Sequence, residues 1–530
     1  MILAGQPQIH STFSIRHSAF RLALSVALSA AACGAIRAQD YRPPADPPAG
    51  NDWSHPSLRA YQARLNAKIG HYREMPLDEK AEYFEWELWR YHLMEQKQIY
   101  SQTELAAAPG VLPTSIPLRD MSTWNGSVMA ALSFKYAVTR EPETLRRLGE
   151  LVRGMHFFFQ VTEVPGLPCR AIHPTRWPNN DHGEMREYIA PDGRKWYYVP
   201  DPAKGGFNQI AGGYAALMMF AAGDLPADVR ALAVADYSAM IKHLIVHDWK
   251  ATDKAGPTSY GDLTPVVGGH GIPFNAQVAY QLVALGHTFP PADEPTAGLF
   301  SREFQRLRNK HHCYFEYPFH ALVLPQRVGG SPLVKGMNDR NHVTNAAFIG
   351  LLLDYDQKRR TGRPVDGTFT HQLGQTMVHA MEELYDKRNA LCTFMWAGLT
   401  RDQNVLKYIV DNERNRLNHQ MRTAQSLVDG VEQLRRFKLD RWWKVGEAVE
   451  VKQMVWNDEF RPDDSIWKVS PFYAFRQTGP ELNQHFCAMD FLYAYWLFRY
   501  FRLDEHVNLR QSAHADVMRR TPGLKTWPTE

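Results

Sequence analysis

Two adjacent segments carry the pattern that decides the fold: STWNGSVMAALSFKYAV at residues 122–138 and EPETLRRLGELVRGMHFFFQ at residues 141–160. The first segment is apolar nearly all round, so a helix formed by it has to be covered on every side. The second segment places Leu145, Leu148 and Leu151 on one stripe and can face water on the other. The pair therefore predicts a helical hairpin in which a buried helix is followed by an amphipathic one.

The same alternation recurs along the chain, with loops rich in Gly, Pro and Asn between the segments. Apolar segments lie at 206–222, 272–285, 342–355 and 482–501, amphipathic ones at 226–246, 296–310 and 368–386, and the 402–436 region continues the series less regularly. Two earlier helices are predicted at 56–70 and 77–99. Strand-like alternation is scarce, so the sequence predicts an all-α protein.

Alternating buried and amphipathic helices predict an (α/α)6 toroid of helical hairpins, with an inner ring of apolar helices and an outer ring of amphipathic ones. The alternative is an open solenoid. A solenoid tends to carry a repeated sequence motif, and none accompanies the alternation here, so the closed toroid is the preferred prediction.

The N-terminus has the features of a removable signal peptide at residues 1–38. Arg16 and Arg21 precede an apolar run at 22–32 that is too short to cross a bilayer, and Ala38 ends a suitable cleavage site. Cys33 leaves a lipoprotein as the alternative, although Ala30 is smaller than a lipobox prefers at that position. We expect a periplasmic or secreted protein in which residues 39–119 form a linker and N-terminal helices, 120–515 the toroid and 516–530 a tail.

Composition and motifs exclude several classes of protein. The formal net charge is +4 and falls to +1 without residues 1–38, so no basic stripe for nucleic acid is expected. No later segment is apolar enough to span a membrane. Nucleotide-binding, metal and redox motifs are missing, so neither a cofactor nor a metal is predicted. For the cysteines of the mature chain, disulfides and buried free thiols are both compatible with the sequence: Cys169, Cys313, Cys392 and Cys487.

The helical alternation, the content of 14 Trp, 23 Tyr and 26 Phe, the signal peptide and the phrase DMSTWNG at residues 120–126 together resemble the six-hairpin (α/α)6-toroid glycosidases and polysaccharide lyases. The resemblance covers most of residues 120–502 and is one of layout. It implies a carbohydrate-active enzyme, either a glycoside hydrolase or a polysaccharide or uronate lyase. Its substrate would be a small molecule or an oligosaccharide, bound in a cleft at one end of the inner ring.

Polar side chains near the starts of the apolar segments are the candidates for that cleft. The densest group is GMNDRNHVTN at residues 336–345, which offers a carboxylate, a cation and a base. The predicted catalytic residues are Asp120, His270, Asp339, His342 and Asp458. The predicted substrate-binding residues are Trp124, Asn208, Gln209, Tyr214, Asn275, Asn338 and Arg340. Each has a structural alternative, such as a helix cap for Asp120 or core filling for Trp124.

The two sugar chemistries need different residues. Hydrolysis needs two carboxylates that flank the bond, for which Asp120, Asp339 and Asp458 are candidates. Elimination needs a base together with an amide or a cation that holds the uronate carboxylate. The candidates for elimination are His270, His342, Tyr214, Asn208 and Arg340. The His and Asn residues at the segment starts tilt the prediction towards elimination.

Two further classes stay open. One is a toroid enzyme that acts on an apolar small molecule, such as a terpenoid-type dehydratase or isomerase, for which Cys169, Cys313 and Cys392 are relevant. The other is a glycan-binding protein without catalysis. The side chains that line the widest cavity distinguish these classes from the sugar enzymes.

Overall fold

The computed structural model describes the greater part of residues 72–504. The described residues are 72–94, 96–99, 102–104, 120–173, 185–265, 273–310, 335–361, 367–401, 413–439, 441–443, 448–450, 452–458, 465–468, 473–475 and 484–504, with 406, 410 and 471. The predicted signal peptide, the 56–70 helix, Cys313 and the 516–530 tail lie outside the described residues.

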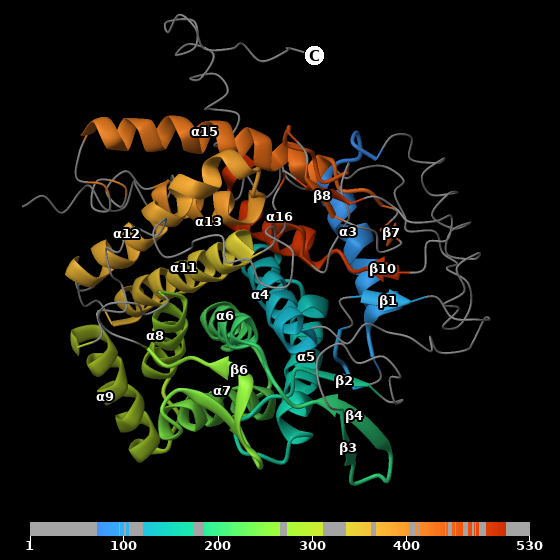
Figure 1. Ribbon diagram of the computed structural model, residues 1–530, viewed down its shortest axis with the longest axis vertical. Coiled ribbons are helices and arrows are strands. Elements are labelled where there is room, and N and C mark those ends of the chain that lie inside the picture. The colour runs from blue at the N-terminus through green and yellow to red at the C-terminus, as the bar shows by residue number, and fades with distance from the viewer. Residues whose placement is uncertain are drawn as a thin grey trace, which may run out of the picture. The chain divides into compact units, whose positions relative to one another are not determined.

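The described part of the chain is mostly helical, which confirms the all-α class (Figure 1). Its α-helices are α3 (Leu77–Glu87), α4 (Met121–Thr139), α5 (Pro142–Gln160), α6 (Lys204–Phe220), α7 (Ala227–Val246), α8 (Pro273–Thr288), α9 (Glu294–Lys310), α11 (Lys335–Thr361), α12 (Gly367–Leu384), α13 (Ala390–Thr400), α15 (Glu413–Arg435) and α16 (Met489–Tyr500). The four hairpins predicted between residues 122 and 386 are confirmed as α4–α5, α6–α7, α8–α9 and α11–α12.

Three predictions about the helices need correction. The 77–99 helix ends early: α3 continues as a π-helix, η1 (Leu88–His92), and Leu93 then forms a bridge with Ile99. The sequence analysis did not separate α13, whose N-cap Asn389 accepts a hydrogen bond from the backbone of Cys392 at 3.1 Å. In the 402–436 region, Leu406 is helical, and the long helix α15 begins at Glu413.

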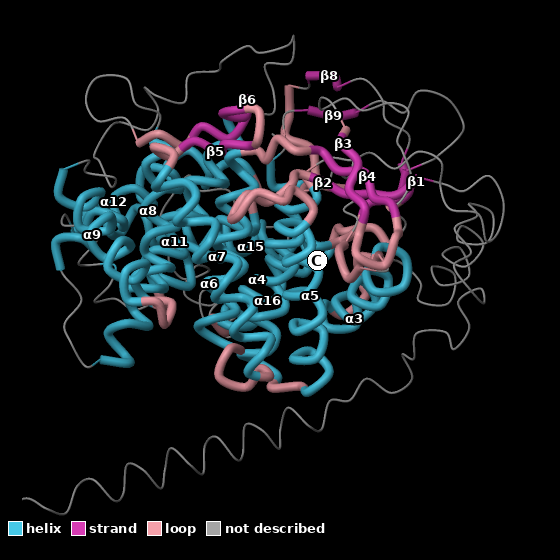
Figure 2. The backbone as a smooth tube through the Cα atoms, turned by 90° about the horizontal axis from the view of Figure 1, so that it is seen from below, coloured by secondary structure: helices cyan, strands magenta, loops and turns pink. Residues whose placement is uncertain are grey.

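Short antiparallel strands join the helices. They are β1 (Gln102–Glu104), β2 (Ala171–His173), β3 (Arg186–Ile189), β4 (Lys195–Val199), β5 (Lys250–Asp253), β6 (Gly256–Asp262), β7 (Trp442–Trp443), β8 (Ala448–Glu450), β9 (Tyr473–Phe475) and β10 (Gln484–Phe486). They pair in the orders β1-β10-β7, β2-β4-β3, β5-β6 and β8-β9. Figure 2 shows β2 to β6, β8 and β9 gathered at one end of the helices.

Six helices form a closed series of contacts. Helix α4 packs on α6, α6 on α8, α8 on α11, α11 on α13, α13 on α16, and α16 packs back on α4 (Figure 1). These are the apolar segments of the sequence, and α4 illustrates why they pack from all sides, since almost every residue from Met121 to Phe134 is buried. Helix α6 also contacts α11 directly, so the helices leave little open space between them.

Neighbouring helices of this series run in the same direction. Near their first turns, Ser127 of α4 donates a hydrogen bond to Gln209 of α6 at 3.1 Å. Near their last turns, Phe134 of α4 and Phe220 of α6 bring their ring centroids within 5.1 Å of each other. Helices α8 and α11 run in the same sense, because Phe274 packs on His342 and, further along, Tyr280 of α8 lies against Gly350 of α11.

The close approach of α4 and α6 depends on Gly126. A Cβ at this position would lie 2.3 Å from the carbonyl oxygen of Gln209 and 2.7 Å from the backbone nitrogen of Ile210. Gly213 of α6 faces Gly126 in return, because a Cβ there would lie 2.5 Å from the Gly126 oxygen. The two helices touch through their backbones, and this contact sets the positions of Trp124 and Gln209 on either side of it.

Each of the other six α-helices packs against a member of the closed series. Helix α5 packs on α4, α7 on α6 and α8, α9 on α8, α12 on α11, α15 on α13 and α3 on α16. Helix α5 buries Leu148, Leu151 and Val152 and keeps its charged face outward, as the sequence predicts for an amphipathic helix. None of the described helices is long and apolar enough to cross a membrane.

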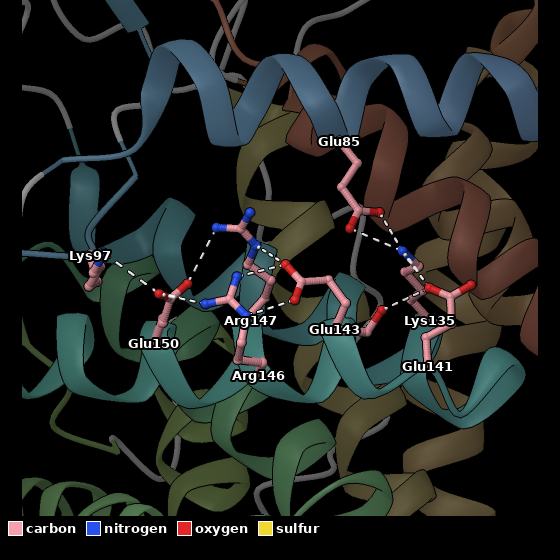
Figure 3. Close-up of polar contacts among 9 residues, drawn as sticks. Glu85, Lys97, Lys135, Glu141, Glu143, Arg146, Arg147 and Glu150 are labelled. Carbon is pink, nitrogen blue, oxygen red and sulfur yellow. Dashed lines mark hydrogen bonds and ion pairs between the residues drawn. The ribbon is translucent and has the colours of Figure 1, made fainter. Parts of the chain in front are cut away.

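Ion pairs connect α3 with α4 and α5 (Figure 3). Lys135 of α4 lies between Glu85 of α3, at 2.9 Å, and Glu141 at the start of α5, at 3.0 Å. Lys135 is mostly buried, so this arrangement is screened less by solvent than an exposed pair. It holds α3 in place beside the closed series.

Candidate functional site

A cavity of about 30 Å³ lies near the N-terminal ends of α4, α6, α13 and α16. It also touches α11 two turns inside that helix, because α11 begins at Lys335, before the predicted start at residue 342. That volume has room for roughly two water molecules. The described residues that line it are Trp124 and Ser127 of α4, Gln209 of α6, Asn341, His342 and Asn345 of α11, Leu391 of α13, Ser465, Trp467 and Lys468, and Met489, Asp490 and Tyr493 of α16. The cavity thus lies where the sequence analysis expects the cleft, at the starts of the apolar helices.

His342 is the base that this cavity offers. The residue is 6 % exposed, and its Nδ1 atom is buried and makes no hydrogen bond to any part of the chain that the structure describes. Burial lowers the pKa of His342 to about 4, since the charge of Asp120 only partly opposes the effect and that of Lys468 adds to it. The imidazole is therefore neutral at pH 7 and can accept a proton.

Helix α6 reaches the His342 ring because residue 205 is glycine. A Cβ at Gly205 would lie 2.6 Å from the Nε2 atom of His342. The ring of Phe274 in α8 also meets the imidazole edge to face, with a centroid distance of 5.7 Å. The imidazole is held between two helices that come from different hairpins.

A chain of side-chain hydrogen bonds runs from the cavity into the core. The Tyr493 hydroxyl donates to Asn345 Oδ1 at 2.9 Å, and Asn345 Nδ2 donates to Asn208 Oδ1 at 2.7 Å. Asn208 Nδ2 then donates to the carbonyl oxygen of His342 at 2.6 Å. Gln281 donates to the backbone oxygen of Asn208 at 3.1 Å. Helices α16, α11, α6 and α8 are joined by these bonds.

Segment 465–468, which contains the 3-10 helix η3 (Ile466–Lys468), forms one wall of the cavity. The Trp467 carbonyl accepts hydrogen bonds from Asn341 of α11 and, at 3.1 Å, from Asn389. The Trp467 indole nitrogen donates to the Asp490 carbonyl at 2.9 Å. Lys468 Nζ lies 5.4 Å from the ring centroid of Trp124, a distance that permits a cation–π contact. The wall thus adds an aromatic ring and a positive charge.

Asp490 is the one carboxylate among the described residues that line the cavity, and its oxygens are engaged. Oδ1 accepts from Arg441 Nη2 at 3.3 Å and from the backbone of Phe491, and Oδ2 accepts from the backbone of Ile466 at 3.0 Å. The residue lies in the first turn of α16 and ties η3 to this helix. These bonds give Asp490 a structural role.

Asp120 lies at the N-cap position of α4, one turn before Trp124. Its Oδ1 accepts a hydrogen bond from Arg170 Nε at 2.6 Å, and its side chain is 27 % exposed. The Asp120 charge acts on the pKa of His342, so the two groups are close, although Asp120 is not among the residues that line the cavity.

Three predicted substrate-binding residues lie away from the cavity, with their polar atoms in use. Asn208 is fully buried in the hydrogen-bond chain described above. Asn275 accepts from Lys204 at 3.2 Å and donates to two carbonyls, one at the end of β6 and one just after it. The Tyr214 hydroxyl donates at 3.0 Å to Asp236 of α7, which also bonds His156. For Asn208, Asn275 and Tyr214 the structure therefore favours a role in positioning and packing over a role in substrate binding.

Asp458 lies outside the set of residues that line the cavity. Its Oδ2 accepts from the Tyr72 hydroxyl at 2.6 Å and from Arg73, and Oδ1 accepts from Arg436 at 3.4 Å. Burial by itself would raise the pKa of Asp458, but the bonds from Tyr72 and Arg73 lower it overall. A carboxylate held ionised by two guanidinium groups stabilises the fold and is poorly suited to donate a proton, so the predicted catalytic role gains no support.

The remaining predictions divide between the cavity and residues that are not described. Trp124 and Gln209 line the cavity, and their role in substrate binding stays a prediction. Arg340 is half-buried on α11 and is not among the lining residues. His270 lies outside the described residues, and for Asn338 and Asp339 the structure describes only the helical backbone.

Four important lining residues were missed by the sequence analysis. Tyr493 sits inside an apolar run, where an aromatic residue normally signals core packing. Trp467 and Lys468 come from a loop with no periodic pattern, and Asn341 was passed over within the cluster that was singled out. The signal that was available is the spacing of Asn341 and Asn345, four residues apart and therefore on one face of α11.

The thiols and acids offer no other chemistry here. Cys169 and Cys392 are free thiols, all three described cysteines including Cys487 are buried, and burial raises the pKa of Cys392 to about 12, so the thiolate that reactivity needs is disfavoured at Cys392. Within the described ranges, no three His, Cys, Asp or Glu side chains are grouped so as to hold a metal ion. The chemistry of the cavity therefore rests on a neutral imidazole, amides, a phenol and a lysine.

No protein-family model matches the chain, and no curated protein matches it either.

Proposed function

We propose that the protein is an exported carbohydrate-active enzyme with an (α/α)6-toroid fold, and that it cleaves an acidic sugar by β-elimination. The closed series α4–α6–α8–α11–α13–α16, with a second helix packed on each member, supports the toroid. The signal-peptide features of residues 1–38 support export to the periplasm or the exterior. The observation that carries the chemistry is the buried neutral imidazole of His342 in a cavity lined by amides and a lysine.

Elimination from a uronate begins with removal of the proton next to the carboxylate. His342 Nδ1 is the group that takes this proton, because it is unprotonated at neutral pH and free of other bonds in the described structure. The electron pair left on carbon forms the double bond while the bond from the neighbouring carbon to the leaving oxygen breaks. The imidazolium then returns its proton to that oxygen, so the proton count balances.

The negative charge that develops on the substrate carboxylate needs stabilisation. Lys468 supplies a positive charge, and Asn341 and Gln209 supply amide groups at the same cavity. The first turns of α4, α6 and α16 lie near this place, and the positive ends of their helix dipoles favour an anion as well. Trp124 and Trp467 provide flat apolar faces for a sugar ring.

Hydrolysis has less support than elimination. It needs two carboxylates across the bond, whereas the lining residues that the structure describes include Asp490 alone, with its oxygens engaged. An apolar substrate is disfavoured by the number of polar groups around the cavity. A sugar ring is larger than the cavity. Trp124 and segment 465–468, which includes Lys468, therefore have to move apart when the substrate binds.

The experiment is a substrate screen of the purified mature chain on acidic polysaccharides of different uronates, such as polygalacturonate, alginate and hyaluronan. Elimination is followed by the ultraviolet absorbance of the unsaturated uronate, and hydrolysis by reducing ends that appear without that absorbance. We expect absorbance to rise with one class of uronate, and His342→Gln to lower the rate by a factor of 10² or more. His287→Gln is the matched control, since His287 bonds Ser301 outside the cavity.

The proposal fails if reducing ends appear without absorbance, or if His342→Gln cleaves as fast as the wild type. It also predicts the pH profile. Activity should persist down to a pH of about 4, where His342 becomes protonated, and fall below it. An acid limb near the ordinary histidine pKa of about 6.5 would point to a different base.

A further inference from the structure

The direction of every hydrogen bond between Tyr493 and His342 is fixed by a single backbone atom. The carbonyl oxygen of His342 can only accept, so Asn208 has to present Nδ2 to it, at 2.6 Å. This orientation turns Asn208 Oδ1 towards Asn345, which must donate through Nδ2, at 2.7 Å. Asn345 therefore turns its Oδ1 towards Tyr493, whose hydroxyl must donate, at 2.9 Å. Neither amide can be flipped without breaking the chain.

The consequence concerns the Tyr493 hydroxyl, which has one hydrogen and two lone pairs. Its hydrogen is committed to Asn345, so the oxygen retains only acceptor capacity. All members of the chain are buried, and Asn208 is fully so. Water therefore cannot readily replace one of these bonds, and an unpaired amide here would be costly. Tyr493 and Asn345 both line the cavity, so the free lone pair is the one that a ligand meets.

We infer that Tyr493 is a specificity-determining residue whose oxygen accepts a hydrogen bond from a ligand hydroxyl, and that the Asn345–Asn208–His342 carbonyl chain imposes this polarity. The inference rests on the proposed function, because it takes the ligand to be a sugar acid that carries hydroxyl groups. It adds that one hydroxyl of that ligand must act as a donor. It also assigns the proton transfers to His342 alone, since Tyr493 has no hydrogen left to give to a leaving group.

The same chain makes Asn208 and Asn345 positioning residues. Asn208 links α6 to the backbone of His342 itself, and Gln281 holds Asn208 from α8 at 3.1 Å. The carbonyl that fixes the polarity therefore belongs to the residue that acts as the base. Selection of the ligand hydroxyl and placement of the base depend on one continuous set of bonds.

The test measures binding of D-glucuronate and D-galacturonate and of their monodeoxyfluoro analogues by isothermal titration calorimetry. Fluorine has nearly the size of a hydroxyl group but cannot donate. We expect the wild type to bind one analogue about tenfold more weakly than its parent sugar, the cost of one lost hydrogen bond. Tyr493→Phe should lose about the same factor for the parent and bind that analogue no worse than the parent.

Two further variants separate selectivity from folding. Tyr495→Phe removes a hydroxyl from the same helix outside the cavity, where it accepts from Arg499 at 2.8 Å, and should bind every probe as the wild type does. Asn345→Leu frees the Tyr493 hydrogen, so the penalty for the fluorinated analogue should shrink. Thermal unfolding of each variant verifies that the variant is folded under the conditions of the binding measurement.

The outcomes distinguish the two proposals. If the wild type binds the parent sugars and all analogues equally, or if Tyr493→Phe retains the tenfold preference, the assignment to Tyr493 is wrong while the sugar-acid site stands. If neither sugar acid nor any uronate polymer binds the wild type, the proposed function fails and the inference falls with it.

Discussion

The substitution Gly126→Ala tests whether the backbone contact between α4 and α6 is needed to build the site. The added Cβ would lie 2.3 Å from the Gln209 oxygen and 2.5 Å from its carbon, whereas carbon atoms in contact are normally about 3.5 Å or more apart. The helices would have to separate by roughly 1 Å. Overpacking costs about 1–3 kcal/mol, and because the obstructing atoms belong to a backbone we expect a cost of about 3 kcal/mol.

Alanine regains about 1 kcal/mol of helix propensity over glycine, which leaves a net loss of about 2 kcal/mol for Gly126→Ala. Gly149→Ala in α5 is the matched control, since the nearest atom to its Cβ would be the end of Arg153 at 3.8 Å. It should stabilise the protein by about 0.5–1 kcal/mol. Urea unfolding followed by circular dichroism measures both. An unchanged or higher midpoint for Gly126→Ala would show that the contact between α4 and α6 tolerates a Cβ at this position.

Three other predictions concern buried charged and titratable groups. Lys80 donates to the carbonyls of Leu434, Arg435 and Phe437 at the end of α15. Lys80→Met should therefore cost about 3 kcal/mol and expose the last turn of α15 to hydrogen exchange; protection as in the wild type would contradict this. Asp458→Asn should lower stability by about 2–4 kcal/mol but leave turnover on any substrate found within about threefold, whereas a catalytic carboxylate would lose at least about 10². His342 should make the wild type lose about 3 kcal/mol more stability than His342→Gln as the pH falls from 6.5 to 4, because the unfolded chain protonates His342 over this range and the folded chain does not. Denaturation of both proteins at both pH values measures this difference, and an equal loss in the two would contradict it.

The helical hairpins could be predicted because their signal is local. Whether a segment is apolar all round or on one stripe depends on residues a few positions apart, and this was enough to find α4 to α9, α11, α12 and α16. Helix α13 was missed because its eleven residues are short and uniformly apolar. The π-helix η1 was missed because the run of aromatic and polar residues continues past the end of α3, so the sequence shows no break there.

The candidate site could be predicted only in part. The position of His342 at the start of an apolar helix marked it as a candidate, and Trp124 and Gln209 were found by the same rule. The rule selected Asn208 and Asn275 equally, although their amides are consumed by neighbouring helices and loops. The spacing of residues predicts which side of a helix a side chain occupies. One side of a helix can contact both the cavity and the packed core, so spacing does not distinguish a lining residue from a core residue.

The sequence alone determined that this chain folds as paired helices and which helices must be covered on every side, because apolar area along one helix is a property of consecutive residues. The tertiary structure decided which polar side chains reach the cavity and which way their hydrogens point. Tyr493 and Asn208 are 285 positions apart in the chain, yet one carbonyl of His342 orients both through Asn345. Hydrogen-bond direction depends on partners brought together from different helices, and no local pattern contains that information.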